Sequence, residues 1–184
     1  FRLTNRGAES TGIFYNNELR SVSETQVIPS TLSELNQKGG PVFVGLDMKV
    51  GDKAPKNAFD SMFDCVSKII KETPKAEIAI LSKFRESVRQ MQKHFVIRWT
   101  ATKELPENIF IETVDRVQGL TVDYCLFFIP NASIRYSLEN KLFNVATSRA
   151  KYNTIIVADN SVLKENMSEE VRKYLLKSQE DKFA

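Results

Sequence analysis

The chain has 184 residues, 42% of them hydrophobic, which is enough to bury one well-packed core but short for two. Its net charge of +3 is too small to indicate nucleic-acid binding from composition alone. No run of about 18 apolar residues predicts a membrane span, and the N-terminus lacks the pattern of a signal peptide. We therefore expect a soluble, cytoplasmic protein with no membrane partner.

The predicted elements alternate between strands and helices along the chain. Residues 1–40 form a polar opening segment with a short helix near 10–19 and a capping box at 31–34. Apolar residues at steps of three and four over 59–70 predict a helix that Asn57 can cap. The other expected elements are strands at 42–46, 78–81, 109–113, 126–129 and 154–158, and helices at 84–95, 137–148 and 169–177, the last capped by Ser168.

This alternation, with strands that are almost continuously apolar, predicts an α/β fold whose mainly parallel sheet is covered by helices on both faces. We expect a single domain at 41–177 and a frayed tail at 178–184. Cys65 and Cys125 lie in apolar stretches without the spacing of a zinc site, so we expect two reduced core thiols and no metal site. His94, the only histidine, is expected on the surface near a helix end.

Two polar blocks stand beside apolar runs. The first reads ETVDRVQGLTVD over 112–123 and precedes YCLFFI, and the second reads FNVATSRAK over 143–151 and precedes TIIVA. Polar residues at the ends of buried strands are where α/β proteins place ligand sites.

These blocks resemble motifs V and VI of superfamily 1 helicases, which usually read TxDxxQGxExD and NVAx[ST]RAK. The opening LTNRGA over 3–8 is similar to the LxxNYRS segment that begins the second motor domain of the family, and IAILSKFR over 78–85 resembles motif IV. The resemblance covers essentially the whole chain. It implies the C-terminal, RecA-like motor domain of a DNA or RNA helicase, with the three-layer fold of P-loop NTPases, and it implies a longer parent protein.

The resemblance assigns Arg149 and Arg6 as catalytic residues that reach the γ-phosphate of ATP. Arginine suits this role because its planar, permanently charged fork stabilises charge that builds on phosphoryl oxygens. The family has a tyrosine before the second of these arginines, but this chain has Asn5, so an adenine-stacking ring is missing there.

The resemblance places four residues at the nucleotide: Gln118, Gly119, Arg85 and Lys151. The glycine lets the backbone approach a ligand, while the neighbouring amide can bridge nucleotide and nucleic acid. Thr121 stands where the family often has a glutamate that contacts the ribose, so this chain departs from the family pattern at the sugar contact.

Four further residues are assigned to nucleic acid: Thr113, Asn144, Thr147 and Ser148. The last three also suit the orientation of the arginine, or a link to motif V. Asp115 is expected to cap a turn rather than to act as an acid or base. Trp99 follows a strand-like run at 95–98 and either stacks a base or packs in the core.

The segment between Ser82 and Lys103 is locally basic, with one acid, Glu86, against six cations. Arg85, Arg89 and Lys93 fall four residues apart on one helical face. Such a row either is simply solvated or contacts phosphate groups.

The chain contains no GxxxxGK[ST] phosphate loop and no apolar strand that ends in Asp-Glu. ATP and Mg²⁺ are therefore expected to be held mainly by a first RecA-like domain, and this chain alone is expected to be inactive. The other expected partner is single-stranded nucleic acid, DNA rather than RNA. Two alternatives stay open: a non-enzymatic nucleic-acid-binding module, and an interaction domain derived from a helicase.

Overall fold

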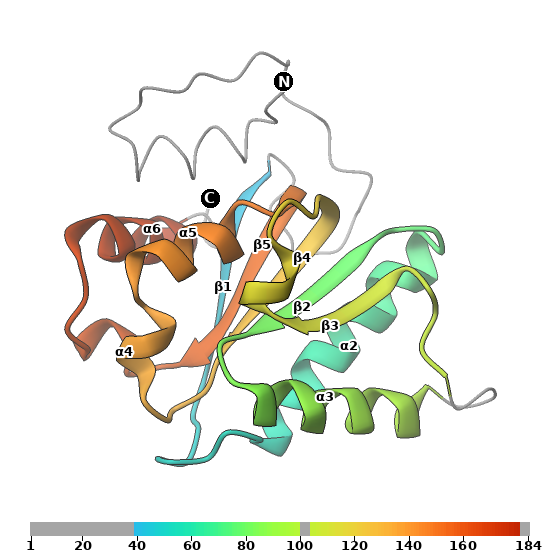
Figure 1. Ribbon diagram of the computed structural model, residues 1–184, viewed down its shortest axis with the longest axis horizontal. Helices are drawn as coiled ribbons and strands as arrows, with labels where there is room; N and C mark the ends of the chain where they lie inside the picture. The colour runs from blue at the N-terminus through green and yellow to red at the C-terminus, as the bar shows by residue number, and fades with distance from the viewer. Residues whose placement is uncertain (1–38, 100–103, 181–184) are drawn as a thin grey trace.

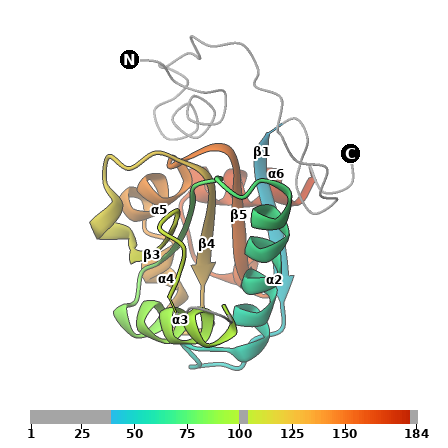
Figure 2. The same cartoon turned by 90° about the vertical axis from the view of Figure 1, so that its right-hand side faces the viewer.

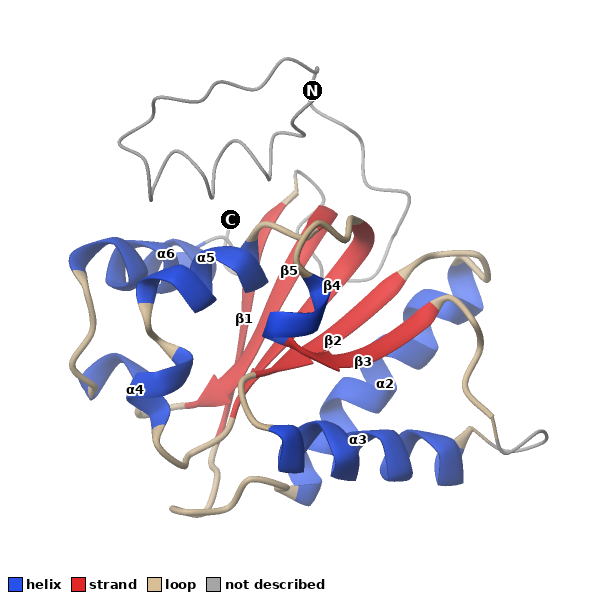
Figure 3. Cartoon of the chain, in the orientation of Figure 1, coloured by secondary structure: helices blue, strands red, loops and turns tan. Residues whose placement is uncertain are grey.

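The computed structural model describes residues 39–99 and 104–180, and within them five parallel strands form one sheet between two groups of helices (Figures 1 and 3). The strands are β1 (Gly40–Leu46), β2 (Ile78–Ser82), β3 (Ile109–Thr113), β4 (Val122–Ile129) and β5 (Ala150–Asp159), in the spatial order β1-β5-β4-β2-β3. The helices are α2 (Lys56–Glu72), α3 (Arg85–Arg98), α4 (Ile134–Ser137), α5 (Asn140–Thr147) and α6 (Glu169–Glu180), with short 3₁₀ turns η1 (Val114–Val117) and η2 (Val162–Lys164).

Each face of the sheet has its own hydrophobic core. Helices α2 and α3 cover one face, and η1 with α4, α5 and α6 covers the other, as the side view in Figure 2 shows. Successive residues of β4 point to opposite faces: Phe127 packs edge-on against Phe143 of α5, and Phe128 against Phe59 of α2, with ring centroids 5.8 and 5.7 Å apart. The predicted three-layer α/β fold is thus confirmed.

Strand β2 and most of β4 and β5 are buried because helices cover both faces, which explains why their sequences are nearly continuously apolar, whereas the edge strand β3 alternates between buried and half-buried residues. Predicted strand 109–113 matches β3, and the other four predicted strands lie inside observed ones. Ser168 caps the last helix as expected, since its hydroxyl accepts a hydrogen bond from the amide of Val171 at 3.3 Å. Among the helices of the described ranges, none is both long and apolar enough to span a bilayer.

Several element boundaries differ from the predictions. The helix expected at 137–148 begins later, as α5 at Asn140, because Glu139 has an extended backbone and its carboxylate accepts hydrogen bonds from Lys141 N and Leu142 N; Ser137 ends the separate helix α4. The run 95–98 belongs to α3 and is not a strand. The final helix continues to Glu180, and Ser178 is buried rather than part of a frayed tail.

Three side chains also depart from expectation. Asn57 does not cap α2, which begins after Pro55; its amide donates to the carbonyl of Asp47 at 2.8 Å. His94 is not a surface residue but is half-buried, with Nε2 3.2 Å from Asp60 Oδ1. Trp99 packs on the core that α2 and α3 share. The opening helix and capping box, at 10–19 and 31–34, lie outside the described residues.

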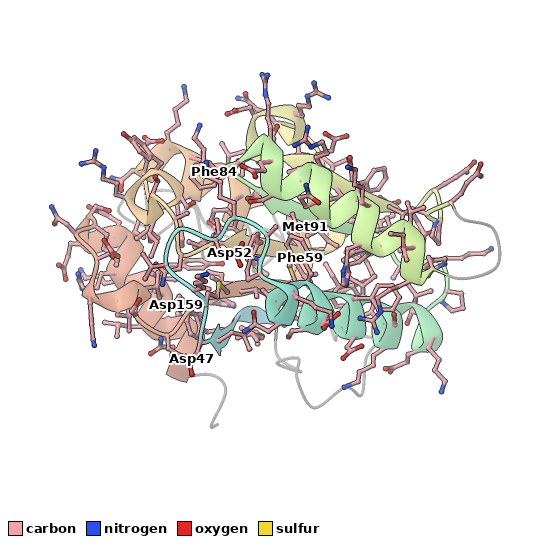
Figure 4. All side chains as sticks on the ribbon, turned by 90° about the horizontal axis from the view of Figure 1, so that it is seen from below. Asp47, Asp52, Phe59, Phe84, Met91 and Asp159 are labelled. Atoms are coloured by element: carbon pink, nitrogen blue, oxygen red, sulfur yellow. The ribbon has the colours of Figure 1, made fainter. Side chains whose placement is uncertain are left out.

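The loop between β1 and α2 is held at the carboxyl edge of the sheet, where Figure 4 labels Asp47, Asp52 and Asp159. Asp159, at the end of β5, accepts hydrogen bonds from Met48 N at 2.7 Å and from the amide and hydroxyl of Ser161. Asn131, after β4, donates to the carbonyl of Met48 at 3.2 Å. Side chains at the ends of two strands, β5 and β4, therefore fix this loop.

Replacing Asp159 with asparagine is expected to lower the free energy of unfolding, with a defined pH dependence. Burial raises the pKa of Asp159, but the hydrogen bonds from Ser161 and Met48 lower it by more than burial raises it. The pKa of Asp159 in the folded protein is therefore below its ordinary value. Its carboxylate therefore contributes stability above the ordinary pKa of about 3.9, and this contribution is lost as the pH falls through the lower folded value. Denaturant titrations between pH 3 and pH 7 measure the effect.

The difference in the free energy of unfolding between the native chain and Asp159→Asn should be largest at neutral pH and should shrink below about pH 4. The exposed carboxylate variant Asp64→Asn is the control for a simple loss of charge. A difference between native chain and Asp159→Asn that stays constant across the whole range would refute this account.

Candidate functional site

The predicted site residues divide between the two edges of the sheet. Arg85 follows β2 and Thr113 ends β3, so both lie at the carboxyl edge. Arg149 and Lys151 lie at the start of β5, at the amino edge. Even a five-residue strand is about 16 Å long, so Arg85 is not brought together with Arg149. The polar residues of the two blocks therefore lie at the ends of strands, but at opposite edges of the sheet.

The two edges are connected by residues 113–121, which we call the motif V crossing. It leaves β3 at the carboxyl edge and enters β4 at the amino edge, and β2 lies between these strands. Val114 and Val117 of η1 are buried in the core that α5 and α6 share. The crossing therefore lies on the same face of the sheet as the motif VI helix α5.

The crossing ends in a tight turn that requires a glycine. Gln118 has φ −59° and ψ 124°, Gly119 has φ +88°, and the amide of Leu120 donates to the carbonyl of Val117 at 3.0 Å. A Cβ on Gly119 would meet nothing within 4 Å, so the requirement is conformational rather than steric. Gln118 is exposed, and within the described residues its side chain makes no hydrogen bond.

Arg149 is the residue that joins motif VI to the motif V crossing. Its Nε donates to the carbonyl of Val145 at 3.0 Å and one terminal nitrogen donates to Ser148 Oγ at 3.0 Å. The other terminal nitrogen donates to the carbonyls of Leu120 at 3.2 Å and Val117 at 3.5 Å. We call this set of contacts the Arg149 clip. It occupies most of the five donors of a guanidinium.

The positive charge of Arg149 is not neutralised within the described part of the chain. Its acceptors there are carbonyl and hydroxyl oxygens, and no carboxylate forms an ion pair with it. Burial lowers the pKa of Arg149, although an arginine stays protonated at neutral pH. A partly buried cation with only neutral partners is well suited to meet an arriving phosphate group.

The three polar residues that precede Arg149 have different surroundings. Ser148 accepts a hydrogen bond from Arg149 through its hydroxyl, a contact that would orient the arginine. Thr147 is fully buried and donates to the carbonyl of Phe143 at 2.8 Å, so in this arrangement it has no surface for a bound strand. Asn144 is partly buried, and its side-chain oxygen has no hydrogen-bond partner in the described residues.

The remaining predicted residues are also placed. Lys151 is exposed and lies 3.9 Å from a carboxylate oxygen of Asp123, across the amino ends of β5 and β4. Thr113 ends β3 and is 8% exposed. Asp115 lies in η1, which has no side-chain cap. Arg6 and its neighbour Asn5 lie outside the described residues.

A row of cations lies on the outer face of α3. Arg85, Arg89 and Lys93 are all exposed, and the structure gives none of them an ion pair or hydrogen bond in the ranges it describes. The nearby acid, Glu86, is 3.9 Å from Lys53. We call these three residues the α3 row. Steps of four residues place its cations about 6 Å apart along the helix axis.

Sequence reasoning missed a pocket of about 390 Å³ between the motif V crossing, α4 and α5. Lys83, Tyr136 and Lys141 line it together with Gln118. These residues are far apart in the chain, and no short motif links them. No signal in the sequence would bring them together.

Comparison with known proteins places the chain among relatives of similar architecture. A family model described as an AAA domain (AAA_12) matches residues 9–161. No curated protein matches the chain. Among solved structures, the C-terminal domain of a possible DNA helicase from Lactobacillus plantarum WCFS1 is similar over 95% of this chain and 93% of that chain, with a TM-score of 0.56 and 13% identity.

Two other solved structures are similar over smaller parts. The helicase domain of Pyrococcus furiosus Hef matches 58% of this chain and 26% of that chain, with a TM-score of 0.41 and 15% identity. The helicase MrfA bound to DNA matches 65% of this chain and 20% of that chain, with a TM-score of 0.39 and 13% identity. At these TM-scores, neither adds to the assignment of the fold.

The parallel sheet with helices on both faces, together with its similarity to the Lactobacillus plantarum domain, confirms the RecA-like fold predicted from the sequence. The family model covers most of the chain, from the opening segment to the end of β5. The chain therefore belongs to the AAA-domain family.

Proposed function

We propose that this chain is the second motor domain of an ATP-dependent helicase or translocase and supplies arginine to ATP bound on a first RecA-like domain. The observation that carries the proposal is the Arg149 clip: a partly buried guanidinium that has no carboxylate partner among the described residues and is hydrogen-bonded directly to the motif V crossing. The structural similarity to a helicase C-terminal domain agrees with this proposal at the level of the fold.

In the proposed motor, ATP and Mg²⁺ are held mainly by the first domain. Arg149 and Arg6 are the catalytic arginines, and Lys151, Gln118 and Gly119 lie near the nucleotide. The cations of Arg149 and Lys151 suit phosphate oxygens. Arginine supplied across an interface accelerates phosphoryl transfer because it stabilises charge that develops on those oxygens.

The Arg149 clip suggests how nucleotide and strand are coupled. Most donors of the guanidinium are occupied within its own domain, so reaching a phosphate requires it to leave the carbonyls of Val117 and Leu120. That departure frees the end of the motif V crossing, whose other end is Thr113 at the carboxyl edge. Closure of the two domains over ATP would thus change the strand-contacting edge, and reopening would restore it.

Single-stranded nucleic acid, DNA in preference to RNA, is proposed to lie along the carboxyl edge near Thr113 and the start of α3. Arg85 belongs to this surface by position, at the opposite edge from Arg149. The α3 row continues it with exposed cations whose spacing of about 6 Å is close to that of successive phosphates in an extended strand. The whole motor is proposed to act in the cytoplasm.

Removing the charges of the α3 row is expected to weaken strand binding and to flatten its salt dependence. Each phosphate contact contributes about 0.7 to the slope of log affinity against log salt for single strands, so the triple glutamine variant should lose about 2 of that slope. Fluorescence anisotropy with a labelled oligonucleotide measures it. The matched control removes the same charge at three other exposed lysines, Lys71, Lys75 and Lys173.

An equal loss of slope in the control would show that the α3 row has no special role.

ATP hydrolysis by the complete protein, with and without single-stranded DNA or RNA, tests the motor itself. The inward hydrogen bonds of Arg149 also fit a non-enzymatic nucleic-acid-binding module, in which this residue only holds the fold. Strand binding without any hydrolysis would favour that module.

A further inference from the structure

The pocket between the motif V crossing, α4 and α5 has the lining of a site for a flat, uncharged ring. Three apolar side chains line it: Val114 from η1, and Leu142 and Val145 from α5. Tyr136, on α4, is 50% exposed; Arg135 lies over its ring, with Cζ 5.1 Å from the ring centroid, and the rest of the ring offers an aromatic surface. The exposed amide of Gln118 provides both a donor and an acceptor.

The charges around the pocket argue against a phosphate as its occupant. Two lysines, Lys83 and Lys141, are balanced by two acids, Asp115 and Glu139. A polyanion gains little from such a balanced set, whereas a neutral heterocycle is not repelled by it. The volume of about 390 Å³ is within the usual range for small-ligand sites.

We propose that this pocket holds one base of the bound single strand, stacked on Tyr136 with its edge at the amide of Gln118. The inference rests on the proposed function, because it assigns a binding pocket to one base of the strand that the proposed motor binds. Lys83 connects the two surfaces, since it lines the pocket and stands just before Arg85 of the α3 row. The phosphates lie on the row, and the base turns into the pocket.

Tyr136→Ala in the complete protein is expected to weaken binding of a labelled oligothymidylate about 5- to 150-fold, which corresponds to the usual stacking contribution of about 1–3 kcal/mol per base. Tyr136→Phe keeps the ring and should bind like the native protein. The salt slope should be unchanged in both variants, because no phosphate contact is lost. Thermal unfolding checks that the fold is retained at this exposed position.

Three results would overturn the inference. Equal strand affinity of native protein and Tyr136→Ala would show that no base stacks there. Weaker binding of a non-hydrolysable ATP analogue with unchanged strand affinity would assign the ring to adenine instead. A parallel fall in affinity for Tyr136→Phe would show that the hydroxyl, not stacking, is what matters.

The test separates this inference from the proposed function. Strand-stimulated ATP hydrolysis by the native protein, with equal affinity of native protein and Tyr136→Ala, would leave the motor intact and remove only the base subsite. A native protein that neither binds a strand nor hydrolyses ATP would remove both.

Discussion

Replacing Arg149 with alanine in the complete protein is expected to lower strand-stimulated ATP hydrolysis by about a hundredfold or more. The guanidinium has no carboxylate partner in the described residues, so its charge remains available to stabilise the transferred phosphoryl group. Steady-state hydrolysis at saturating single-stranded DNA measures the effect. Because the arginine is proposed to act in the transition state, kcat should fall much more than the affinity for ATP.

The Arg149→Ala variant also removes the Arg149 clip, so a structural effect must be distinguished from a catalytic one. Arg149→Lys keeps the charge but cannot form the same fork of hydrogen bonds. If catalysis depends on the fork, the lysine variant should be nearly as slow as the alanine variant while its thermal midpoint stays closer to that of the native protein. Full hydrolysis in the alanine variant would contradict the motor proposal.

Phe127→Ala should produce the largest loss of stability among the substitutions considered, about 3–5 kcal/mol in the free energy of unfolding. The side chain is fully buried in β4, the strand between β5 and β2, and packs on Phe143 of the motif VI helix. Its removal leaves a cavity that a sheet covered on both faces cannot easily close. Denaturant unfolding of the chain measures the change.

Val50→Ala is the matched control, because Val50 is 82% exposed in the loop after β1. Its effect should be within about 0.5 kcal/mol of zero. A loss of less than about 1 kcal/mol for Phe127→Ala would mean that the core between β4 and α5 is loosely packed. The motif VI helix would then lack the support that this structure gives it.

The fold was largely predictable because burial on both faces leaves a strong signal in the sequence. The run YCLFFI is apolar throughout since Phe127 and Phe128 enter different cores, and helix α2 shows its apolar face at the expected steps. The break between α4 and α5 was not predictable from periodicity. It depends on Glu139, whose carboxylate binds two backbone amides that a continuous helix would use itself.

The candidate site residues could be named from the sequence, but their arrangement in space could not. Motif V could be recognised, yet its return to the amino edge follows from strand order, which no local pattern contains. The partners of Arg149 are mainly backbone carbonyls, which every residue has, so the sequence cannot show which residues will provide them. The pocket at Tyr136 needs four segments to meet, so it becomes visible only when the chain is folded.

The motif V crossing has a mechanical consequence. Its two ends are attached to β3 and β4, which are not neighbours but are both hydrogen-bonded to β2 along five paired residues each. A pull on the crossing along the strands therefore acts as shear on two ladders, in which the hydrogen bonds carry the load together rather than one after another. The sheet therefore resists a force applied at the Arg149 end of the crossing, and the crossing changes its conformation before the strands separate.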